Sequence, residues 1–120
     1  MHKKEVFKNL ASKYNIHLYT GLYGYAMRYC HRQLENFNRE KKYSKVLEIG
    51  AGDAPHLDYL EHEYDEYFVA ETSSYAIESC RERKNIKAHS YDGVNLPFKD
   101  NFFDRIIISQ CLEHINEPEK

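Results

Sequence analysis

Short apolar runs alternate along this 120-residue sequence with segments of helical periodicity, and this alternation restricts the fold more than any other feature. The runs predict four strands, at residues 46–49, 67–70, 86–89 and 103–109. The last contains the uninterrupted Ile106-Ile107-Ile108, which predicts a strand buried on both faces. Strands that alternate with helices predict βαβ units, and hence an α/β fold with a doubly wound parallel sheet and helices on both sides.

Helices are predicted between the first two strands and between the next two. Pro55 suits the first turn of the first helix. Thr72 or Ser73 can cap the second, because both side chains can accept a hydrogen bond from the first turn. The apolar residues that share a helix face are Leu57, Leu60 and Tyr64 in the first helix, and Ala76, Ile77 and Cys80 in the second.

Residues 1–43 are expected to form an N-terminal helical segment, and residues 44–120 the sheet domain. Residues 1–18 are interpreted as a helix, and apolar residues recur at helical spacing from Gly21 to about Lys42. The sequence Asn116-Glu117-Pro118-Glu119 is typical of a helix start. We therefore expect the domain to be truncated at its C-terminus, just as a helix begins.

Composition and charge argue against several classes of protein. With 17 basic and 19 acidic residues the net charge is −2, so no nucleic-acid partner is expected. No apolar run reaches about 18 residues, so no membrane span is expected. Cys30, Cys80 and Cys111 fit neither a zinc spacing nor a disulfide framework, which makes a cytoplasmic location the simplest interpretation. His56 and His62 lie six residues apart and are expected at the surface.

A glycine-containing loop follows the first predicted strand and marks the candidate ligand site. Gly50-Ala51-Gly52-Asp53-Ala54 comes directly after Ile49. In a doubly wound sheet, ligands bind beyond the carboxyl ends of the strands, where the strand order reverses. Glu71 lies 21 residues after Gly50, which is the position of an acidic residue that binds ribose hydroxyls. An exposed loop glutamate without a ligand is the alternative.

The chemistry of this loop selects among nucleotide-like ligands. A dinucleotide-binding loop needs a third glycine where this sequence has Pro55. Glu48 and Asp53 would face a diphosphate, and like charges ~4 Å apart in a partly desolvated site repel by about 4 kcal/mol. The same charges attract a cation, so an adenosine compound with a sulfonium and an ammonium group fits better. An NAD-dependent oxidoreductase is therefore disfavoured.

The loop resembles motif I of the class I S-adenosylmethionine-dependent methyltransferases, an acidic residue followed by x-G-x-G-x-G. Glu48, Gly50 and Gly52 match it, while Ala54 replaces the third glycine. Alanine admits close packing but is not expected to adopt a left-handed backbone. The downstream sequence resembles the small-molecule, type 11-like branch, in which a D…LPF…FD…LEH order is typical. The matching stretches are Tyr91-Asp92-Gly93, Leu96-Pro97-Phe98, residues 101–104 (NFFD) and residues 111–115 (CLEHI).

This resemblance covers about residues 44–120 and implies a fold and a function. The fold is the first half, about four strands, of a Rossmann-like sheet with the strand order 3-2-1-4-5-7-6. The function is transfer of a methyl group from S-adenosylmethionine to an unidentified, small-molecule acceptor. A non-catalytic adenosine-binding or interaction module is the alternative, because a fold does not determine a function. With four strands, the fourth would be an exposed apolar edge, which predicts self-association.

The resemblance also implies which residues contact the methionine part of the cofactor. The backbone of Gly50-Ala51-Gly52 would pack against it, with Glu48 near its amino group. Ser109 and Gln110, at the end of the fourth strand, would lie along the same part. The N-terminal helical segment would close over the cofactor as a lid, with either Tyr19 or Tyr23 contributing.

The adenosine part is assigned to the other two loops. Glu71, with Thr72 beside it, would bind the ribose hydroxyls. Asp92 would accept a hydrogen bond from the adenine amine, and Gly93 would leave space beside the ring.

Catalysis in this family is an in-line displacement at an activated methyl group, so the protein mainly aligns the reactants and excludes water. His114 is the candidate base, because the unperturbed pKa of histidine lies near neutral. A structural histidine in the turn after the fourth strand is the favoured alternative.

Overall fold

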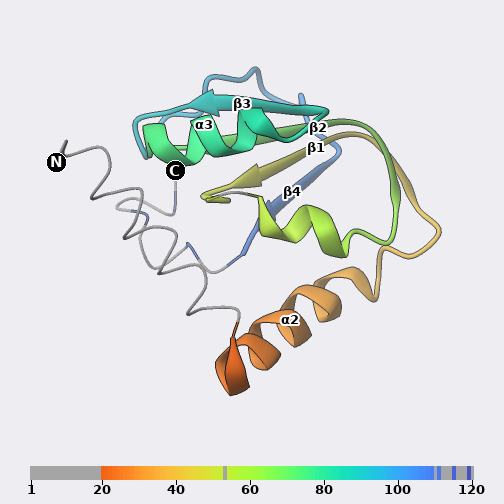
Figure 1. The fold of residues 1–120 in the computed structure, drawn as a ribbon. Helices are drawn as coiled ribbons and strands as arrows, with labels where there is room; N and C mark the ends of the chain where they lie inside the picture. Colours follow the sequence, from red (N-terminus) through yellow and green to blue (C-terminus); the bar gives the residue numbers. More distant parts are fainter. Residues whose placement is uncertain (1–19, 53, 110, 112–114, 116–118, 120) are drawn as a thin grey trace, which may run out of the picture.

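Four parallel strands form one sheet in the order β3-β2-β1-β4 (Figure 1). The computed structural model describes residues 20–52, 54–109, 111, 115 and 119. The four-stranded parallel Rossmann-like sheet predicted from the sequence is confirmed. The strands are β1 (Lys42–Ile49), β2 (Glu63–Glu71), β3 (Ile86–Ser90) and β4 (Arg105–Ile108).

β1 and β2 both begin about four residues earlier than their apolar runs predict. In the added part, Lys42 pairs with Glu63 and Lys45 with Glu66, so opposite charges lie side by side on adjacent strands. The predicted helix that includes Tyr64 is therefore wrong. In its place is η1 (Pro55–Tyr59), one short 3-10 helix, and Tyr64 belongs to β2.

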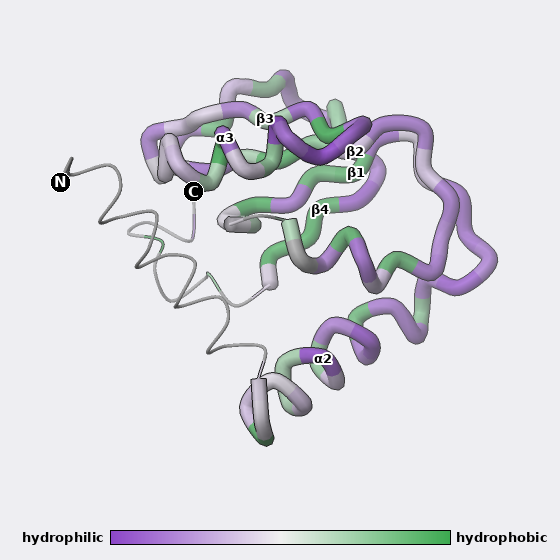
Figure 2. Tube along the Cα trace, viewed as in Figure 1, coloured by the Kyte–Doolittle hydropathy of each residue, from purple (hydrophilic) through white to green (hydrophobic). Residues whose placement is uncertain are grey.

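One face of the sheet is covered by η1 and by α3 (Ser74–Glu82). Ser73 caps α3 by accepting a hydrogen bond from the backbone N–H of Ala76 at 3.4 Å, which decides between the two caps left open by the sequence. The buried core on this face consists of Val46, Ala51, Ala54, Tyr67, Val69, Cys80 and Ile107. Hydrophobic residues are concentrated in the strands, whereas α2 carries mainly hydrophilic ones (Figure 2).

The opposite face is covered by the segment between β3 and β4. Phe98, Phe102 and Phe103 surround Phe68 of β2, with ring centroids 5.2 to 6.0 Å from its ring. The LPF and FFD stretches thus supply a second apolar layer over β1 and β2.

β4 is buried on one face, not on both. Ile107 is 3% exposed, but Ile106 and Ile108 are 53% and 42% exposed. The phenylalanine layer covers β1 and β2 and does not reach β4, so the expectation of two buried faces is wrong. Self-association through this edge stays a prediction.

α2 (Gly21–Glu35) confirms the predicted amphipathic helix, although it ends before Lys42. It lies beside η1, on the same side of the sheet as α3 (Figure 1). The predicted helix at residues 1–18 and the helix start at Asn116 lie outside the described residues. Within the described part of the chain, no helix is long and apolar enough to cross a membrane.

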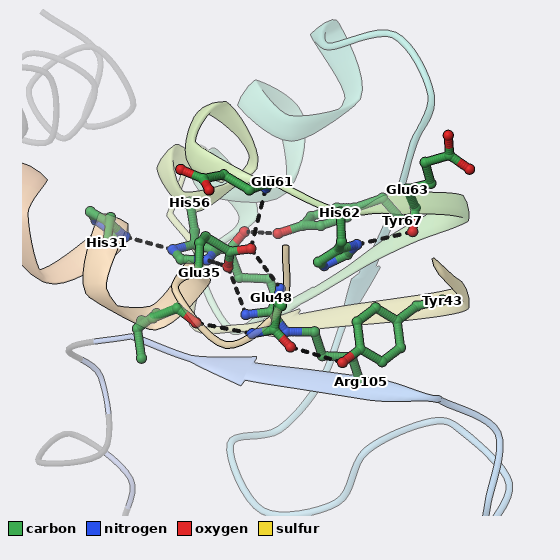
Figure 3. Close-up of polar contacts among 12 residues, drawn as sticks. His31, Glu35, Tyr43, Glu48, His56, Glu61, His62, Glu63, Tyr67 and Arg105 are labelled. Atoms are coloured by element: carbon green, nitrogen blue, oxygen red, sulfur yellow. Dashed lines mark hydrogen bonds and ion pairs between the residues drawn. The ribbon is translucent and has the colours of Figure 1, made fainter. Parts of the chain in front are cut away.

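A buried polar chain connects α2 to η1 (Figure 3). The Nδ1 atoms of His31 and His56 are 2.7 Å apart, and His56 Nε2 donates to Glu35 Oε1 at 2.7 Å. Since Nε2 of His56 carries this proton, a neutral His56 accepts at Nδ1 from His31. His56 is fully buried and His62 is 8% exposed, so the expected surface location of both histidines is wrong.

Glu35 also joins α2 to β4. Arg105 donates to both of its carboxylate oxygens, at 2.6 and 3.1 Å, and the backbone N–H of Glu61 donates at 3.3 Å (Figure 3). Burial opposes ionisation of Glu35, but the hydrogen bonds from His56 and Arg105 and the charge of Arg105 hold its pKa at about 2. The fully buried side chain therefore stays ionised at neutral pH.

Replacing Glu35 by glutamine should destabilise the protein. Glu35→Gln leaves the nearly buried Arg105 guanidinium without its anion, and breaking such a pair lowers the free energy of unfolding by about 3 kcal/mol. Urea unfolding measures the change. Glu78→Gln, at an exposed position on α3, is the matched control. An equal effect of the two variants would contradict the assignment.

Candidate functional site

Loops from all four strands meet at the carboxyl edge of the sheet. The backbone N–H of Gly52, after β1, donates to Glu71 Oε2, after β2, at 3.0 Å. A side chain at Gly93, after β3, would lie 3.6 Å from the Thr72 methyl group. A side chain at Gly50 would lie 2.8 Å from Cys111, which follows β4. Convergence of the four loops, predicted from the sequence, is therefore observed in the structure.

The loop after β1 is built from left-handed backbone. Gly50 and Gly52 have φ of +64° and +59°, and so does Ala54, with φ +59° and ψ +53°. The expectation that alanine would not adopt this conformation is wrong. Because a left-handed conformation costs about 1–2 kcal/mol for a residue with a Cβ atom, Ala54 is a strained position in the loop. Its side chain is fully buried in the core beside Ala51.

Glu48 lies beneath the loop rather than open to a ligand. It is 2% exposed, and the Tyr67 hydroxyl donates to its Oε2 at 2.6 Å (Figure 3). Burial raises its pKa to about 7, although the hydrogen bonds from Tyr67 and from the His56 backbone lower it. The carboxyl is thus only partly ionised at neutral pH. Its expected place near a ligand amino group stays a prediction, and the side chain would meet that group with only part of a negative charge.

The carboxylate of Glu71 spans two loops. Besides Gly52, it accepts from the backbone N–H groups of Thr72 at 2.7 Å and Ser73 at 3.2 Å. The hydroxyl of Thr72 is 3.3 Å from Oε1, the longest of these contacts. Each carboxylate oxygen can accept two hydrogen bonds, so Oε2, which accepts from Gly52, has capacity for a further donor.

Asp92 organises the turn after β3. Its Oδ1 accepts from the backbone of Val94 at 2.8 Å and Asn95 at 2.6 Å, and its Oδ2 accepts from the Asn95 amide at 2.9 Å. Hydrogen bonds from the backbone and side chain of Asn95 and from the backbone of Val94 lower its pKa to about 2. The carboxylate is therefore a fixed hydrogen-bond acceptor beside Gly93.

The structure describes only some of the remaining predicted site residues. Ala51 packs its side chain into the core, so only its backbone faces the loop. Ser109 is half-buried directly after β4. Gln110 and His114 lie outside the described residues. No group of histidine, cysteine and acidic side chains within the described part of the chain could hold a metal ion.

Two cysteines contact the loop and were not assigned to the site from the sequence. Cys111 Sγ lies 3.2 Å from the carbonyl oxygen of Ile49, and Cys80 Sγ lies 3.1 Å from that of Gly52. They approach from β4 and α3, respectively. Their spacing carries no signal, although the position of Cys111 in the loop that follows the fourth predicted strand places that loop at this edge.

The chain resembles known proteins in sequence and in fold. Residues 47–120 match a family model described as a methyltransferase domain. An S-adenosylmethionine-dependent methyltransferase from Aquifex aeolicus is 18% identical with a TM-score of 0.61, over 73% of this chain and 52% of that one. A methyltransferase in complex with the Haloferax volcanii Trm112 methyltransferase activator is 16% identical with a TM-score of 0.56, over 68% and 37%.

The YcgJ protein of Bacillus subtilis is 21% identical with a TM-score of 0.51, over 67% of this chain and 37% of its own. Identities in this range show a shared fold. The chain spans 37% to 52% of the length of these three proteins.

The two loop glycines should differ in their tolerance of a side chain. Gly52→Ala meets no atom within 4 Å and adds only left-handed strain, about 1–2 kcal/mol. Gly50→Ala adds the same strain and a 2.8 Å contact with Cys111, so it should lower the free energy of unfolding by about 1–3 kcal/mol more. Urea unfolding measures both. Cys111→Gly should remove the difference, and equal losses in both alanine variants would refute this packing.

Glu48→Gln should stabilise the protein at high pH and have little effect at low pH. The pKa of Glu48 is raised in the folded state, so its protonated side chain contributes stability that is present below pH 4.5 and lost as the pH rises through about 7. Wild type should therefore match Glu48→Gln near about pH 4.5 and be less stable by on the order of 1–3 kcal/mol near about pH 8. Urea unfolding at both pH values tests this.

The difference between the two proteins isolates Glu48 from other titrating groups. Burial and the charge of His56 lower the pKa of His31 to about 4. Protonation of His31 therefore destabilises the folded protein as the pH falls, which is opposite to the effect of Glu48, but this contribution is the same in both proteins. A difference independent of pH would contradict the raised pKa of Glu48.

Proposed function

This chain belongs to the class I S-adenosylmethionine-dependent methyltransferase family, and on that premise we propose that its loop edge binds the cofactor for methyl transfer to a small-molecule acceptor. S-adenosylmethionine is the cofactor of the family. The observation that carries the proposal is the Glu71 carboxylate, which bridges the loop after β1 and the loop after β2. An adenosine ligand placed there would touch both loops through one anion.

The backbone of Gly50 and Gly52 binds the methionine part in this proposal. Neither residue carries a side chain, and at Gly52 the direction that a side chain would take is open, with no atom within 4 Å. Ser109, after β4, and Gln110 would line the same part. Glu48, which lies beneath the loop and accepts a hydrogen bond from Tyr67, is the residue assigned to the amino group of the methionine part.

The adenosine part lies over the neighbouring loops. Glu71 accepts from the ribose hydroxyls, with Thr72 beside it. Asp92 accepts from the adenine amine, because its carboxylate is held in place by Val94 and Asn95. Gly93 leaves room for the ring next to Thr72.

Catalysis in this proposal consists of positioning. When bound, the cofactor supplies an activated methyl group. The loop backbone and Glu71 orient it, and alignment of reactants alone can remove about 7–11 kcal/mol of barrier in favourable cases. The N-terminal helical segment would act as the lid that excludes water, with the exposed Tyr23 of α2 available for it. His114 remains the candidate base for the acceptor.

A titration calorimetry experiment tests the ligand assignment. S-adenosylhomocysteine should bind wild type, and Glu71→Ala should weaken it about 10–100-fold, because hydrogen bonds to an ionised group are lost. The 2′-deoxy analogue should bind wild type more weakly, and Glu71→Ala should weaken its binding by a smaller factor than it weakens S-adenosylhomocysteine, because only the 3′-hydroxyl contact remains to be lost. Glu78→Ala, exposed on α3, is the control. Binding of NAD without binding of S-adenosylhomocysteine would overturn the proposal.

Turnover is measured separately with a panel of small-molecule acceptors. Methyl transfer to one of them supports the enzyme, whereas binding without transfer to any acceptor, by a protein carrying this chain, favours the alternative of an adenosine-binding module.

A further inference from the structure

Ala54, at the end of the loop after β1, has a strained backbone and a buried side chain. Its left-handed backbone ends the loop after β1, and its side chain is fully buried. Within the loop, its N–H donates to the carbonyl oxygen of Ala51 at 2.9 Å, and its own carbonyl oxygen accepts from Leu57 at 3.3 Å. The first is a neutral hydrogen bond of ordinary length, and the second is a long one. They do not account for a conformation that alanine rarely adopts.

A guanidinium from the neighbouring helix holds the same residue. Arg83, at the C-cap of α3, donates from Nη1 to the carbonyl oxygen of Ala54 at 2.7 Å and from Nη2 to Asp58 Oδ1 at 2.6 Å. One planar group thus binds both Ala54, the residue before η1, and Asp58, a residue within η1. The two contacts come from separate nitrogens of one planar fork, a geometry that the single nitrogen of lysine does not offer.

The contact with Ala54 depends on the backbone conformation of that residue. Rotation about ψ sets the direction of the carbonyl group, so relaxation of Ala54 to a right-handed conformation would turn the oxygen away from Arg83. A charge-assisted hydrogen bond is about twice as strong as a neutral one, so the bond favours the strained state directly. The ion pair with Asp58, whose side chain is 67% exposed, adds little energy but orients the guanidinium.

α3 therefore restrains the loop at two points. Cys80, one turn before Arg83, contacts the carbonyl oxygen of Gly52, and Arg83 contacts that of Ala54. The N–H of Gly52, the residue that carries the first of these carbonyl groups, donates to Glu71. A change in Ala54 would thus move the backbone that the proposed function assigns to the methionine part of the cofactor.

We propose that Arg83 is a positioning residue for cofactor binding, which holds Ala54 in the left-handed conformation that a glycine would adopt without help. This inference rests on the proposed function. It adds that the replacement of the third motif glycine by alanine is compensated by an arginine 29 residues later. Arg83 acts through Ala54 and is not itself assigned a contact with the cofactor.

A double-mutant cycle between Arg83→Met and Ala54→Gly tests the proposal. Arg83→Met should weaken S-adenosylhomocysteine binding about tenfold, because the loop relaxes with Ala54. In the Ala54→Gly background, the same change should weaken binding by about threefold or less, since glycine needs no restraint to stay left-handed. Ala54→Gly alone should bind nearly as wild type, because relief of strain offsets the lost buried methyl group.

Two control variants distinguish the restraint of Ala54 by Arg83 from an effect of net charge or of the ion pair with Asp58. Arg81→Met removes an exposed arginine from the same end of α3 and should leave binding unchanged. Asp58→Asn keeps the contact with Ala54 and should weaken binding by about twofold or less. A tenfold loss in either control would assign the effect to the net charge or to the ion pair and overturn the proposal.

Thermal unfolding of the same variants without ligand keeps the inference separate from the proposed function. Arg83→Met should lower Tm by about 5 °C in the background that carries Ala54, and by about 2 °C or less in the Ala54→Gly background. Equal shifts in both backgrounds would overturn the role of Arg83, whatever binds at the site. Failure of wild type to bind S-adenosylhomocysteine, with the unequal shifts intact, would instead refute the cofactor assignment and leave the restraint of Ala54 in place.

Discussion

The buried carboxylate of Glu35 is the contact on which the arrangement of the helical segment and the sheet depends. It receives hydrogen bonds from His56 of η1, from Arg105 of β4 and from the backbone of Glu61, just before β2. One side chain of α2 thus fixes the positions of three segments that are distant from it in sequence. Because η1 directly follows the glycine-containing loop, the same anion also fixes the end of that loop that is farther from β1.

The loop after β1 has a strained backbone and is restrained by contacts with α3. The loop after β1 uses left-handed backbone at two glycines and at one alanine, and α3 contacts its carbonyl oxygens through Cys80 and Arg83. A glycine-rich loop in a class I methyltransferase obtains its shape from the conformational freedom of its residues. In this chain a neighbouring helix also contacts the loop, which links the packing of α3 to the geometry of the proposed cofactor site.

Electrostatics at this edge differ from what a count of acidic residues indicates. Glu48 and Glu71 are both acidic and both adjoin the loop, yet their surroundings separate them. Glu48 is desolvated and has a pKa raised to about 7, whereas Glu71 accepts several backbone hydrogen bonds at the surface of the loop. Among the described residues, Glu71 and Asp92 are therefore the anions that a ligand at this edge could reach, and the proposed discrimination against a diphosphate rests less on Glu48 than its position in the sequence indicates.

The amino-acid pattern alone was enough to predict the four strands, the parallel sheet and the edge at which Gly52, Glu71 and Gly93 meet, because loops after parallel strands share one edge. It also indicated the family, through short motifs in a characteristic order. The early starts of β1 and β2, the burial of His56 and Glu48, and the left-handed conformation of Ala54 became visible only in the folded chain. Each of these depends on a partner distant in sequence, such as Arg83, which is 29 residues from Ala54. Local periodicity cannot report such pairs, since the energy that overrides local preference comes from contacts formed only when the chain has folded.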